Sequence, residues 1–148
     1  MCSVNLWQEL NKQMKKLYII RGVPGSGKST FAKTLGVPYY EADMYFEQGG
    51  EYKYDKELIH HAHKWCSRKV REAMEAGIDV ASCNTFTRRR EMKGLVESAV
   101  ELGYKVVIVD CRHNFKNVHA VPDDKVEIMR NRWQEIPEDW DVEIVRIP

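Results

Sequence analysis

The chain has 148 residues, 43% of them hydrophobic, which is enough to bury one core and is the size of a single domain. Its 23 basic and 22 acidic side chains give a formal net charge of +1, which excludes a surface that binds polyanions everywhere, so any contact with nucleic acid must come from local patches. The apolar runs at 17–20 and 104–109 fall far short of the roughly 18 residues that a membrane span needs.

The N-terminus and the cysteines indicate a cytoplasmic protein. Residues 1–16 contain neither the apolar stretch nor the small-residue cleavage site of a signal peptide. We expect residues 1–13 to be an extension outside the core fold and 14–148 to form one domain. The cysteines form no C-x-x-C pair and no metal-binding spacing, and such scattered thiols are typical of a reducing compartment; they are Cys2, Cys66, Cys83 and Cys111.

Residues 22–30 are the central motif of the sequence. They read GVPGSGKST, which fits G-x-x-x-x-G-K-[ST], the phosphate-binding loop (P-loop) of nucleoside-triphosphate-binding proteins. An apolar, β-prone run at 17–20 precedes the motif and a helical segment at 30–35 follows it, so its context favours a P-loop over an ordinary glycine turn. The predicted ATP-binding residues are Gly22, Val23, Pro24, Gly25, Ser26, Gly27, Lys28, Ser29 and Thr30.

Each residue type in the motif has a physical role. Glycine backbone can adopt positive φ and approach phosphate oxygens without a Cβ in the way. Successive backbone N–H groups can then point inward and form an anion-binding nest. We expect Lys28 to reach the β- and γ-phosphates of ATP and the hydroxyl of Ser29 to ligate Mg²⁺.

Strands and helices alternate along the rest of the chain. This order implies right-handed crossovers and a parallel sheet covered on both faces. We therefore predict an α/β three-layer sandwich with about five parallel strands, a P-loop NTPase fold of the nucleoside-kinase-like type. Beyond the P-loop unit, the predicted elements are strands at 38–42, 78–83, 104–110 and 142–147, and helices at 55–76, at 88–102 with Thr87 as its cap, and at 122–134.

The longest predicted helix begins at the N-cap Asp55 and ends before Gly77. Its apolar positions recur at helical spacing, which predicts one buried face. The residues expected on that face are Leu58, Ala62, Trp65, Cys66, Lys69, Ala73 and Ala76.

Ligands of parallel α/β sheets bind at the carboxyl ends of the strands, and Asp43 ends the second predicted strand. A carboxylate there could take the proton of a hydroxyl acceptor during phosphoryl transfer, although a turn-capping role explains the position equally well. Asn84 and Thr85 follow the third strand and could hold the acceptor or a Mg²⁺-bound water, or simply cap the next helix. Arg88 and Arg90 open that helix together with a third arginine, where cations oppose the helix dipole, so either an anionic partner or a solvated surface accounts for them.

The region after the fourth strand is rich in cations. A mobile lid carrying positive charge would offset the charge that develops on a transferred phosphoryl group. Asp110, which ends the fourth strand, is left without a role, and the spacing of His60, His61 and His63 does not favour a metal cluster. The cations of the covering segment are Arg112, Lys116, Arg130 and Arg132.

From about residue 14 to residue 133 the chain resembles the kinase domain of bacteriophage polynucleotide 5′-hydroxyl kinases, related small P-loop ATP-binding proteins and zeta-toxin-like kinases. The P-loop motif is specific to the superfamily, and the weaker markers occur in the expected order. These are the segment 40–45 with Asp43, the run EYKY at 51–54, Asn84-Thr85 followed by arginines, and AVPD at 120–123.

The resemblance implies that Lys28 and Ser29 serve ATP and Mg²⁺, that Asp43 is the general base, and that a lid cation stabilises the transferring group. It also implies transfer of the γ-phosphate of ATP to a 5′-hydroxyl of DNA or RNA, or to a small molecule. The chain departs from the pattern at three places. Phe46 replaces an arginine that binds the acceptor's phosphate, Cys83 and Phe86 replace polar residues of the third-strand loop, and Lys116 takes the place of the lid arginine, leaving Arg112 to supply a guanidinium.

The sequence therefore supports an ATP-dependent kinase, with a nucleic-acid 5′ end as the leading acceptor. A small-molecule kinase for a nucleotide or sugar is the second hypothesis, favoured by Phe46 and the near-zero net charge. The altered loop at 84–86 keeps a non-catalytic ATP-binding module as a third hypothesis, and a plain ATPase is disfavoured because no water-positioning residue is identifiable.

Overall fold

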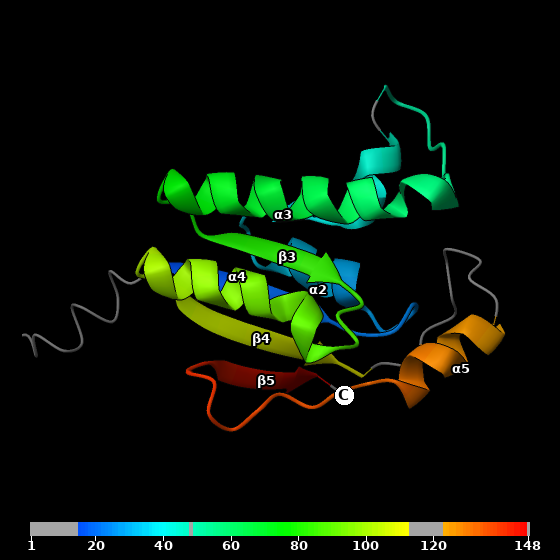
Figure 1. The fold of residues 1–148 in the computed structure, drawn as a ribbon. Coiled ribbons are helices and arrows are strands. Elements are labelled where there is room, and N and C mark those ends of the chain that lie inside the picture. The colour runs from blue at the N-terminus through cyan, green and yellow to red at the C-terminus, as the bar shows by residue number, and fades with distance from the viewer. Residues whose placement is uncertain (1–14, 48, 113–122, 148) are drawn as a thin grey trace, which may run out of the picture.

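The computed structural model describes residues 15–47, 49–112 and 123–147, and it shows a five-stranded parallel sheet with the strand order β2-β3-β1-β4-β5. Helices cover both faces of the sheet (Figure 1), so the predicted three-layer α/β sandwich is confirmed. The strands are β1 (Lys16–Arg21), β2 (Tyr39–Tyr40), β3 (Val80–Asn84), β4 (Lys105–Cys111) and β5 (Glu143–Ile147). The helices are α2 (Lys28–Thr34), η1 (Ala42–Glu47), η2 (Lys56–Leu58), α3 (Ile59–Glu75), α4 (Arg89–Glu101) and α5 (Asp123–Asn131), of which η1 and η2 are 3₁₀ helices.

Two apolar clusters hold the layers together, one on each face of the sheet. Because side chains alternate along a strand, Leu17 and Ile19 of β1 face the helices α3 and α4, whereas Ile20 faces α2. The central strands β1 and β4 are buried on both faces, as a parallel strand between two helical layers must be. The carboxyl ends of β1, β3 and β4 therefore meet at one edge of a rigid sheet, next to the loop that precedes α2 (Figure 1).

The helix α3 is buried along a narrower and slightly rotated stripe than the sequence predicts. Its buried residues recur every four positions and are Ala62, Cys66, Val70 and Met74. The prediction was right for Ala62 and Cys66 but wrong for Leu58, which is 38% exposed, and for Ala76, which is also exposed. Trp65, Lys69 and Ala73, also predicted for this face, are partly buried beside the stripe, so they form its margin.

The ends of α3 follow local rules. The carboxylate of Asp55 accepts a hydrogen bond from the backbone N–H of Glu57 at 3.0 Å, which confirms it as the N-cap residue, although the chain first forms the short helix η2. Gly77 has φ 75° directly after the C-cap Ala76, the left-handed conformation that ends helices.

The start of α4 differs from the prediction, because the N-cap residue is Arg88 rather than Thr87. The carboxylate of Glu91 accepts the backbone N–H of Arg88 at 3.0 Å and the hydroxyl of Thr87 at 3.4 Å. Glu91, inside the helix, thus binds the backbone N–H at the start of α4, and the hydroxyl of Thr87 does not cap the helix as predicted.

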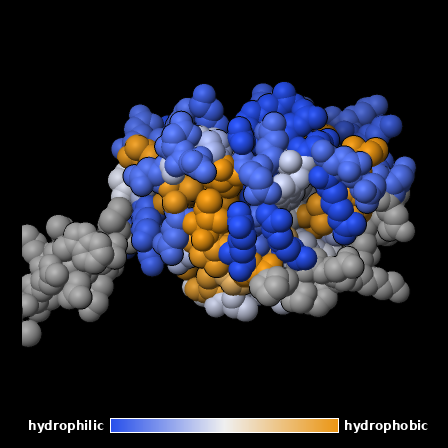
Figure 2. All heavy atoms as spheres, turned by 90° about the horizontal axis from the view of Figure 1, so that it is seen from below, coloured by the Kyte–Doolittle hydropathy of each residue, from blue (hydrophilic) through white to orange (hydrophobic). Residues whose placement is uncertain are grey.

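The last strand, β5, lies at the edge of the sheet beside β4, as predicted, and its side chains are largely exposed. Seen from below, apolar atoms are at the surface over this part of the fold (Figure 2), where Ile144 is 42% and Val145 is 36% exposed. Within the described residues, no helix is both long and apolar enough to cross a membrane.

The position of the buried stripe of α3 gives a first prediction. Met74 is 2% exposed, so Met74→Ala should lower the free energy of unfolding by roughly 2–4 kcal/mol through the cavity it leaves. Lys69→Ala on the neighbouring stripe should change it by less than about 0.5 kcal/mol. Urea unfolding of both variants measures the two values, and equal losses would contradict the observed orientation of the helix.

Candidate active site

The P-loop connects β1 to α2 and its backbone is shaped by glycine. Gly25 and Gly27 have φ of 83° and 90°, which other residues rarely adopt. At Gly22 a Cβ atom would lie 2.1 Å from Oγ of Ser26 and 2.8 Å from the carbonyl oxygen of Cys111, so no side chain fits there. The buried hydroxyl of Ser26 has no hydrogen-bond partner among the described residues. A tight loop with an unsatisfied polar atom fits the phosphates of ATP.

Lys28 is folded back onto the loop from which it comes. Its Nζ donates a hydrogen bond to the carbonyl oxygen of Val23 at 3.1 Å. Burial lowers the pKa of Lys28, and the negative charges of Glu41 and Asp43 oppose that effect. The lysine therefore lies at a partly desolvated position close to two acids, where an anionic phosphate would compensate the cost of its charge.

The first turn of α2 places Ser29 against an acid that the sequence analysis did not select. The hydroxyl of Ser29 donates to Oε1 of Glu41 at 2.5 Å, and Glu41 lies directly between β2 and η1. A hydroxyl and a carboxylate in contact are the oxygen ligands that Mg²⁺ prefers, so this pair fits the predicted metal position. Only its place one residue after a strand at the ligand-binding edge could have indicated Glu41 in the sequence.

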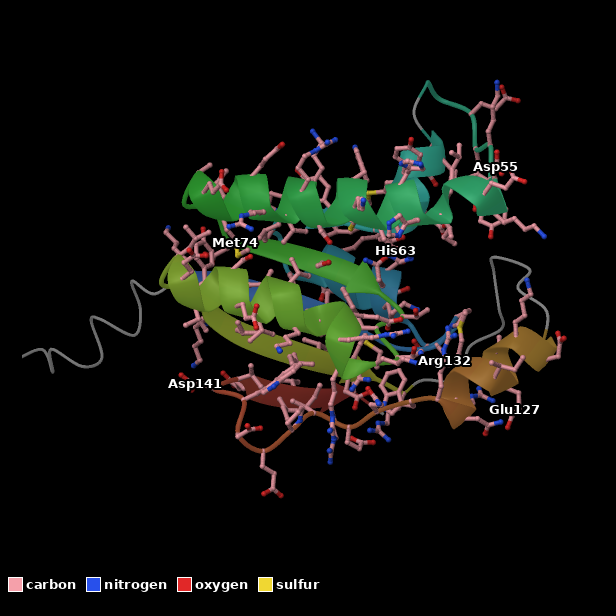
Figure 3. All side chains as sticks on the ribbon, viewed as in Figure 1. Asp55, His63, Met74, Glu127, Arg132 and Asp141 are labelled. Atoms are coloured by element: carbon pink, nitrogen blue, oxygen red, sulfur yellow. The ribbon has the colours of Figure 1, made fainter. Side chains whose placement is uncertain are left out.

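Asp43 does not end the second strand as predicted: it lies three residues after the end of β2, in the first turn of the 3₁₀ helix η1. The hydroxyl of Tyr52 donates to its Oδ1 at 3.3 Å. The side chain of His63 points from the start of α3 toward the end of β3 (Figure 3), and the charge of Asp43 acts on it: desolvation lowers the pKa of His63, while Glu91 and Asp43 raise it. The predicted general base thus lies at the same edge as Lys28, and its charge reaches both Lys28 and His63.

The loop between β3 and α4 is fixed to both sides of this edge. Oδ1 of Asn84 accepts the backbone N–H of Ala42 at 2.9 Å, and its Nδ2 lies 3.5 Å from Sγ of Cys66. The carbonyl oxygen of Thr85 accepts the N–H of Gly22 at 3.3 Å. Asn84 therefore positions the residue next to Asp43, and the backbone of Thr85 holds the start of the P-loop.

The three arginines after this loop have different surroundings. Arg89 donates from its backbone to Oε1 of Gln134 at 2.8 Å and from Nε to the carbonyl of Glu135 at 2.7 Å. Arg88 is half-buried and Arg90 is exposed, and within the described ranges neither side chain forms an ion pair. Among the three arginines, only Arg89 is thus tied by its side chain to the segment after α5 within the part of the chain that the structure describes.

A fully buried arginine, Arg21, ends β1 directly before the P-loop. Its guanidinium donates to the carbonyl of Phe86 at 2.8 and 3.0 Å and to that of Gln134 at 2.7 Å, and it lies 3.7 Å from the ring centroid of Trp133. Burial lowers the pKa of Arg21 to about 10, and the negative charge of Asp110 is the strongest effect that raises it. Three segments far apart in the sequence are held by this one side chain, and the sequence analysis missed it because a charge at a strand end does not indicate burial.

The cations of the predicted lid are only partly described. Arg112 donates to Oδ2 of Asp110 at 2.7 Å and lies 3.3 Å from Oε1 of Glu135, so it is paired in this structure. Arg130 lies 3.8 Å from Glu127 of the same helix, and Lys116 lies outside the described residues. Asp110, left without a role by the sequence, is the buried partner of Arg112 and a charge that stabilises Arg21.

Two of the three departures from the kinase pattern lie within the described residues and have structural explanations, whereas the third, Lys116, lies outside them. Phe46 is 5% exposed and packs within an aromatic cluster, so the place of an acceptor-binding arginine is filled by core. Cys83 is buried and desolvation raises its pKa far above the ordinary value, so it stays a neutral thiol. Phe86 has φ 45°, a rare value for an aromatic residue, and its carbonyl is the one that Arg21 holds.

A separate hollow of about 500 Å³ lies between β4, β5 and the segment before β5. Its lining includes Asp110, Arg112, Glu135 and Trp140 but no residue of the P-loop and not Asp43. Among the described residues predicted for the site, Arg112 alone lines this hollow, whereas the P-loop and Asp43 lie outside its lining.

Comparison with known proteins agrees with this geometry. Residues 17–117 match the family AAA_33, described as an AAA domain. The chain is 34% identical over 134 residues to human NEDD4-binding protein 2, an alignment that covers 80% of this chain and only 8% of that protein. It superimposes on a putative kinase from Chloroflexus aurantiacus with a TM-score of 0.64 and 15% identity, covering 91% of this chain and 85% of that one. It also superimposes on a chain of the Pnkp1/Rnl/Hen1 RNA repair complex with a TM-score of 0.52 and 19% identity, covering 84% of this chain and 40% of the other.

The buried arginine gives a second prediction. Arg21→Met keeps the apolar volume but leaves buried carbonyl groups unpaired, so it should lower the free energy of unfolding by roughly 3 kcal/mol or more. The matched control is Arg68→Met, an exposed arginine of α3 with one ion pair to Glu72, which should cost less than about 1 kcal/mol. Urea unfolding followed by circular dichroism measures both, and similar small losses would show that Arg21 does not hold the three segments.

Lys28 gives a third prediction, because its charge costs free energy in the absence of nucleotide. Lys28→Met should abolish phosphoryl transfer while leaving the free energy of unfolding unchanged or higher. The folded-state pKa of Lys28 is lowered, so between that pKa and the unfolded value the unfolded chain binds more protons and stability rises with pH. This rise should be missing in Lys28→Met when unfolding is measured across alkaline pH, and an unchanged pH profile would contradict the assignment.

Proposed function

The chain belongs to the AAA_33 family of P-loop kinases, and from this premise we propose that it transfers the γ-phosphate of ATP to the 5′-hydroxyl of a DNA or RNA strand. The observation that carries the proposal is the placement of Asp43 at the P-loop edge, where Ser29 of α2 contacts Glu41 and Asn84 of β3 holds the backbone of Ala42. An acid there can act on an acceptor hydroxyl while the lysine binds the donor's phosphates.

Different residues of the chain would bind the triphosphate, hold Mg²⁺ and accept the proton of the acceptor hydroxyl. The glycines of the P-loop and Lys28 bind the triphosphate, and Ser29 with Glu41 would hold Mg²⁺, which when bound offsets negative charge on the phosphate oxygens. Asp43 takes the proton of the acceptor hydroxyl as its oxygen forms a bond to the γ-phosphorus. The bond from that phosphorus to the β–γ bridging oxygen breaks, and its electron pair leaves with ADP.

A cation is also needed where charge develops on the transferring group. Arg112 at the end of β4 is our candidate, together with Lys116, which lies outside the described residues. Arg112 is paired with Asp110 and Glu135, and contact with phosphate oxygens would replace those ion pairs. The role of Arg112 is thus coupled to nucleotide binding.

Support for a nucleic-acid acceptor comes from the loop after β3. Arg88 and Arg90 start α4 at the carboxyl edge, on the chain that follows Asn84 and Thr85, and they form no ion pair among the described residues. Guanidinium groups in such a position can contact the phosphates of a strand whose 5′ end lies at Asp43.

A small-molecule kinase is the second candidate, and the buried Phe46 favours it because no cation for an acceptor phosphate lies at that position. A non-catalytic ATP-binding module is the third. Transfer of labelled γ-phosphate to 5′-hydroxyl DNA and RNA oligonucleotides, compared with a panel of nucleosides and sugars, separates the three. Transfer to oligonucleotides alone supports our proposal, transfer to a metabolite alone supports the second, and ATP binding without any transfer supports the third.

The role of Asp43 gives a fourth prediction. Asp43→Asn keeps the size of the side chain but removes the proton acceptor, so kcat should fall by roughly 10²–10⁴-fold while ATP still binds. The matched control is Asp141→Asn, which changes an exposed acid at the opposite edge of the fold (Figure 3) and should keep full activity. Steady-state kinetics and ATP calorimetry on both variants give the result, and an Asp43→Asn enzyme with wild-type kcat would remove Asp43 from the mechanism.

A further inference from the structure

The segment between η1 and η2 carries two large aromatic side chains into solvent. It projects at the carboxyl edge of the sheet, beside the start of α3 (Figure 1). Tyr52 is 51% exposed and Tyr54 is 53% exposed. About half of the accessible surface of each residue is thus in contact with water, and neither side chain belongs to the buried clusters of the fold.

Both rings are nevertheless held in place. The backbone N–H of Lys53 donates to the carbonyl of Phe46 at 2.8 Å, which fixes the segment to η1. The ring centroid of Phe46 lies 6.4 Å from that of Tyr52 and 5.2 Å from that of Tyr54, at interplanar angles of 79° and 63°. An edge-to-face contact covers at most one face of a ring, so Phe46 leaves the other face of each tyrosine ring uncovered. Phe46 is thus the buried support of two oriented, solvent-facing rings.

The support is linked directly to the proposed chemistry. Phe46 and Asp43 belong to the same 3₁₀ helix, and the hydroxyl of Tyr52 contacts Oδ1 of Asp43 at 3.3 Å. A group that stacks on these rings therefore lies beside the carboxylate that receives the acceptor hydroxyl.

We propose that Tyr52 and Tyr54 bind the 5′-terminal nucleobase of the acceptor strand by stacking, and so place its 5′-hydroxyl at Asp43. This inference rests on the proposed function and names how the same site selects its acceptor. Base stacking on aromatic side chains tolerates every base, because each base has a π face. Phe46, which replaces a cation that would bind the acceptor's phosphate, here supports recognition of the base instead.

The charges around the rings favour a flat, neutral group over an anion. Asp43 lies against Tyr52, and Lys53 between the two tyrosines is paired with Glu51 at 3.7 Å. Near Tyr52 a phosphate or carboxylate would meet the negative charge of Asp43, whereas the face of a base would not.

The first experiment compares two 5′-hydroxyl oligonucleotides that differ only at the 5′-terminal nucleotide, which carries a base in one and is abasic in the other. Tyr54→Ala should raise KM for the oligonucleotide that carries the terminal base roughly tenfold or more, with KM for ATP and kcat little changed. Tyr54→Phe, which keeps the aromatic ring, should have the wild-type KM for this oligonucleotide. The abasic substrate should already have the higher KM with the wild-type enzyme and be insensitive to Tyr54→Ala. Equal effects on both substrates, or none, would overturn the proposal while leaving the kinase activity standing.

The second experiment reads binding without turnover. Lys28→Met is mixed with an oligonucleotide that carries 2-aminopurine at its 5′ end, because stacking quenches the fluorescence of this base. Tyr54→Ala or Ile144→Ala, the latter on the distant strand β5, is then added to Lys28→Met. Loss of quenching with Tyr54→Ala but not with Ile144→Ala supports the stacking site, even if no transfer to oligonucleotides is found. Absence of quenching with a folded protein, checked by its thermal midpoint, would show that the rings do not receive a base.

Discussion

The arrangement of the site depends on one buried charge, the guanidinium of Arg21. Its backbone ends β1 and leads into the P-loop, and its side chain holds the backbone of Phe86 and of Gln134. Trp133 covers the guanidinium, and Asp110 supplies the opposite charge in the neighbouring strand. A buried cation is costly unless its donors are used, and here two polypeptide segments supply carbonyl acceptors for Nε and Nη2, while Nη1 has no partner among the described residues. The loop that carries Asn84 and the segment that follows α5 are thereby fixed relative to the phosphate-binding loop.

The groups proposed for the site are hydrogen-bonded to their own neighbours. Lys28 donates to its own loop, Ser29 donates to Glu41, and Tyr52 donates to Asp43. Lys28, Ser29 and Asp43 are proposed to bind ATP, Mg²⁺ and the acceptor hydroxyl, respectively. Each must give up or share its present hydrogen bond when its ligand binds. Binding therefore exchanges existing hydrogen bonds for new ones, so the net gain from each polar contact with a ligand is modest and the arrangement of the groups is largely preformed.

The sequence was sufficient for the class of fold and for the position of the phosphate-binding loop within it, because both depend on local patterns. The motif at residues 22–30 is one contiguous stretch that can be recognised without its partners elsewhere in the chain. The alternation of strands and helices identifies the parallel sheet. Arg21, Glu41 and the aromatic segment were not identified as a unit, since their partners lie elsewhere in the chain: Arg21 meets Phe86 and Gln134 at separations of 65 and 113 residues. The orientation of α3 was only partly predicted for a related reason. Several faces of that helix carry apolar residues, and only packing against the sheet selects Val70 and Met74 over Leu58 and Ala76.

The way in which residues 49–54 are attached has a consequence for altering this protein. Apart from the hydroxyl of Tyr52, which contacts Asp43, the contacts of the segment among the described residues are with η1: two backbone hydrogen bonds, to Glu47 and to Phe46, and two ring contacts with Phe46. The phosphate-binding loop and Arg21 are held by other residues. Acceptor preference could therefore be redesigned, or could drift during evolution, by exchanging this short stretch as a cassette, without rebuilding the nucleotide pocket.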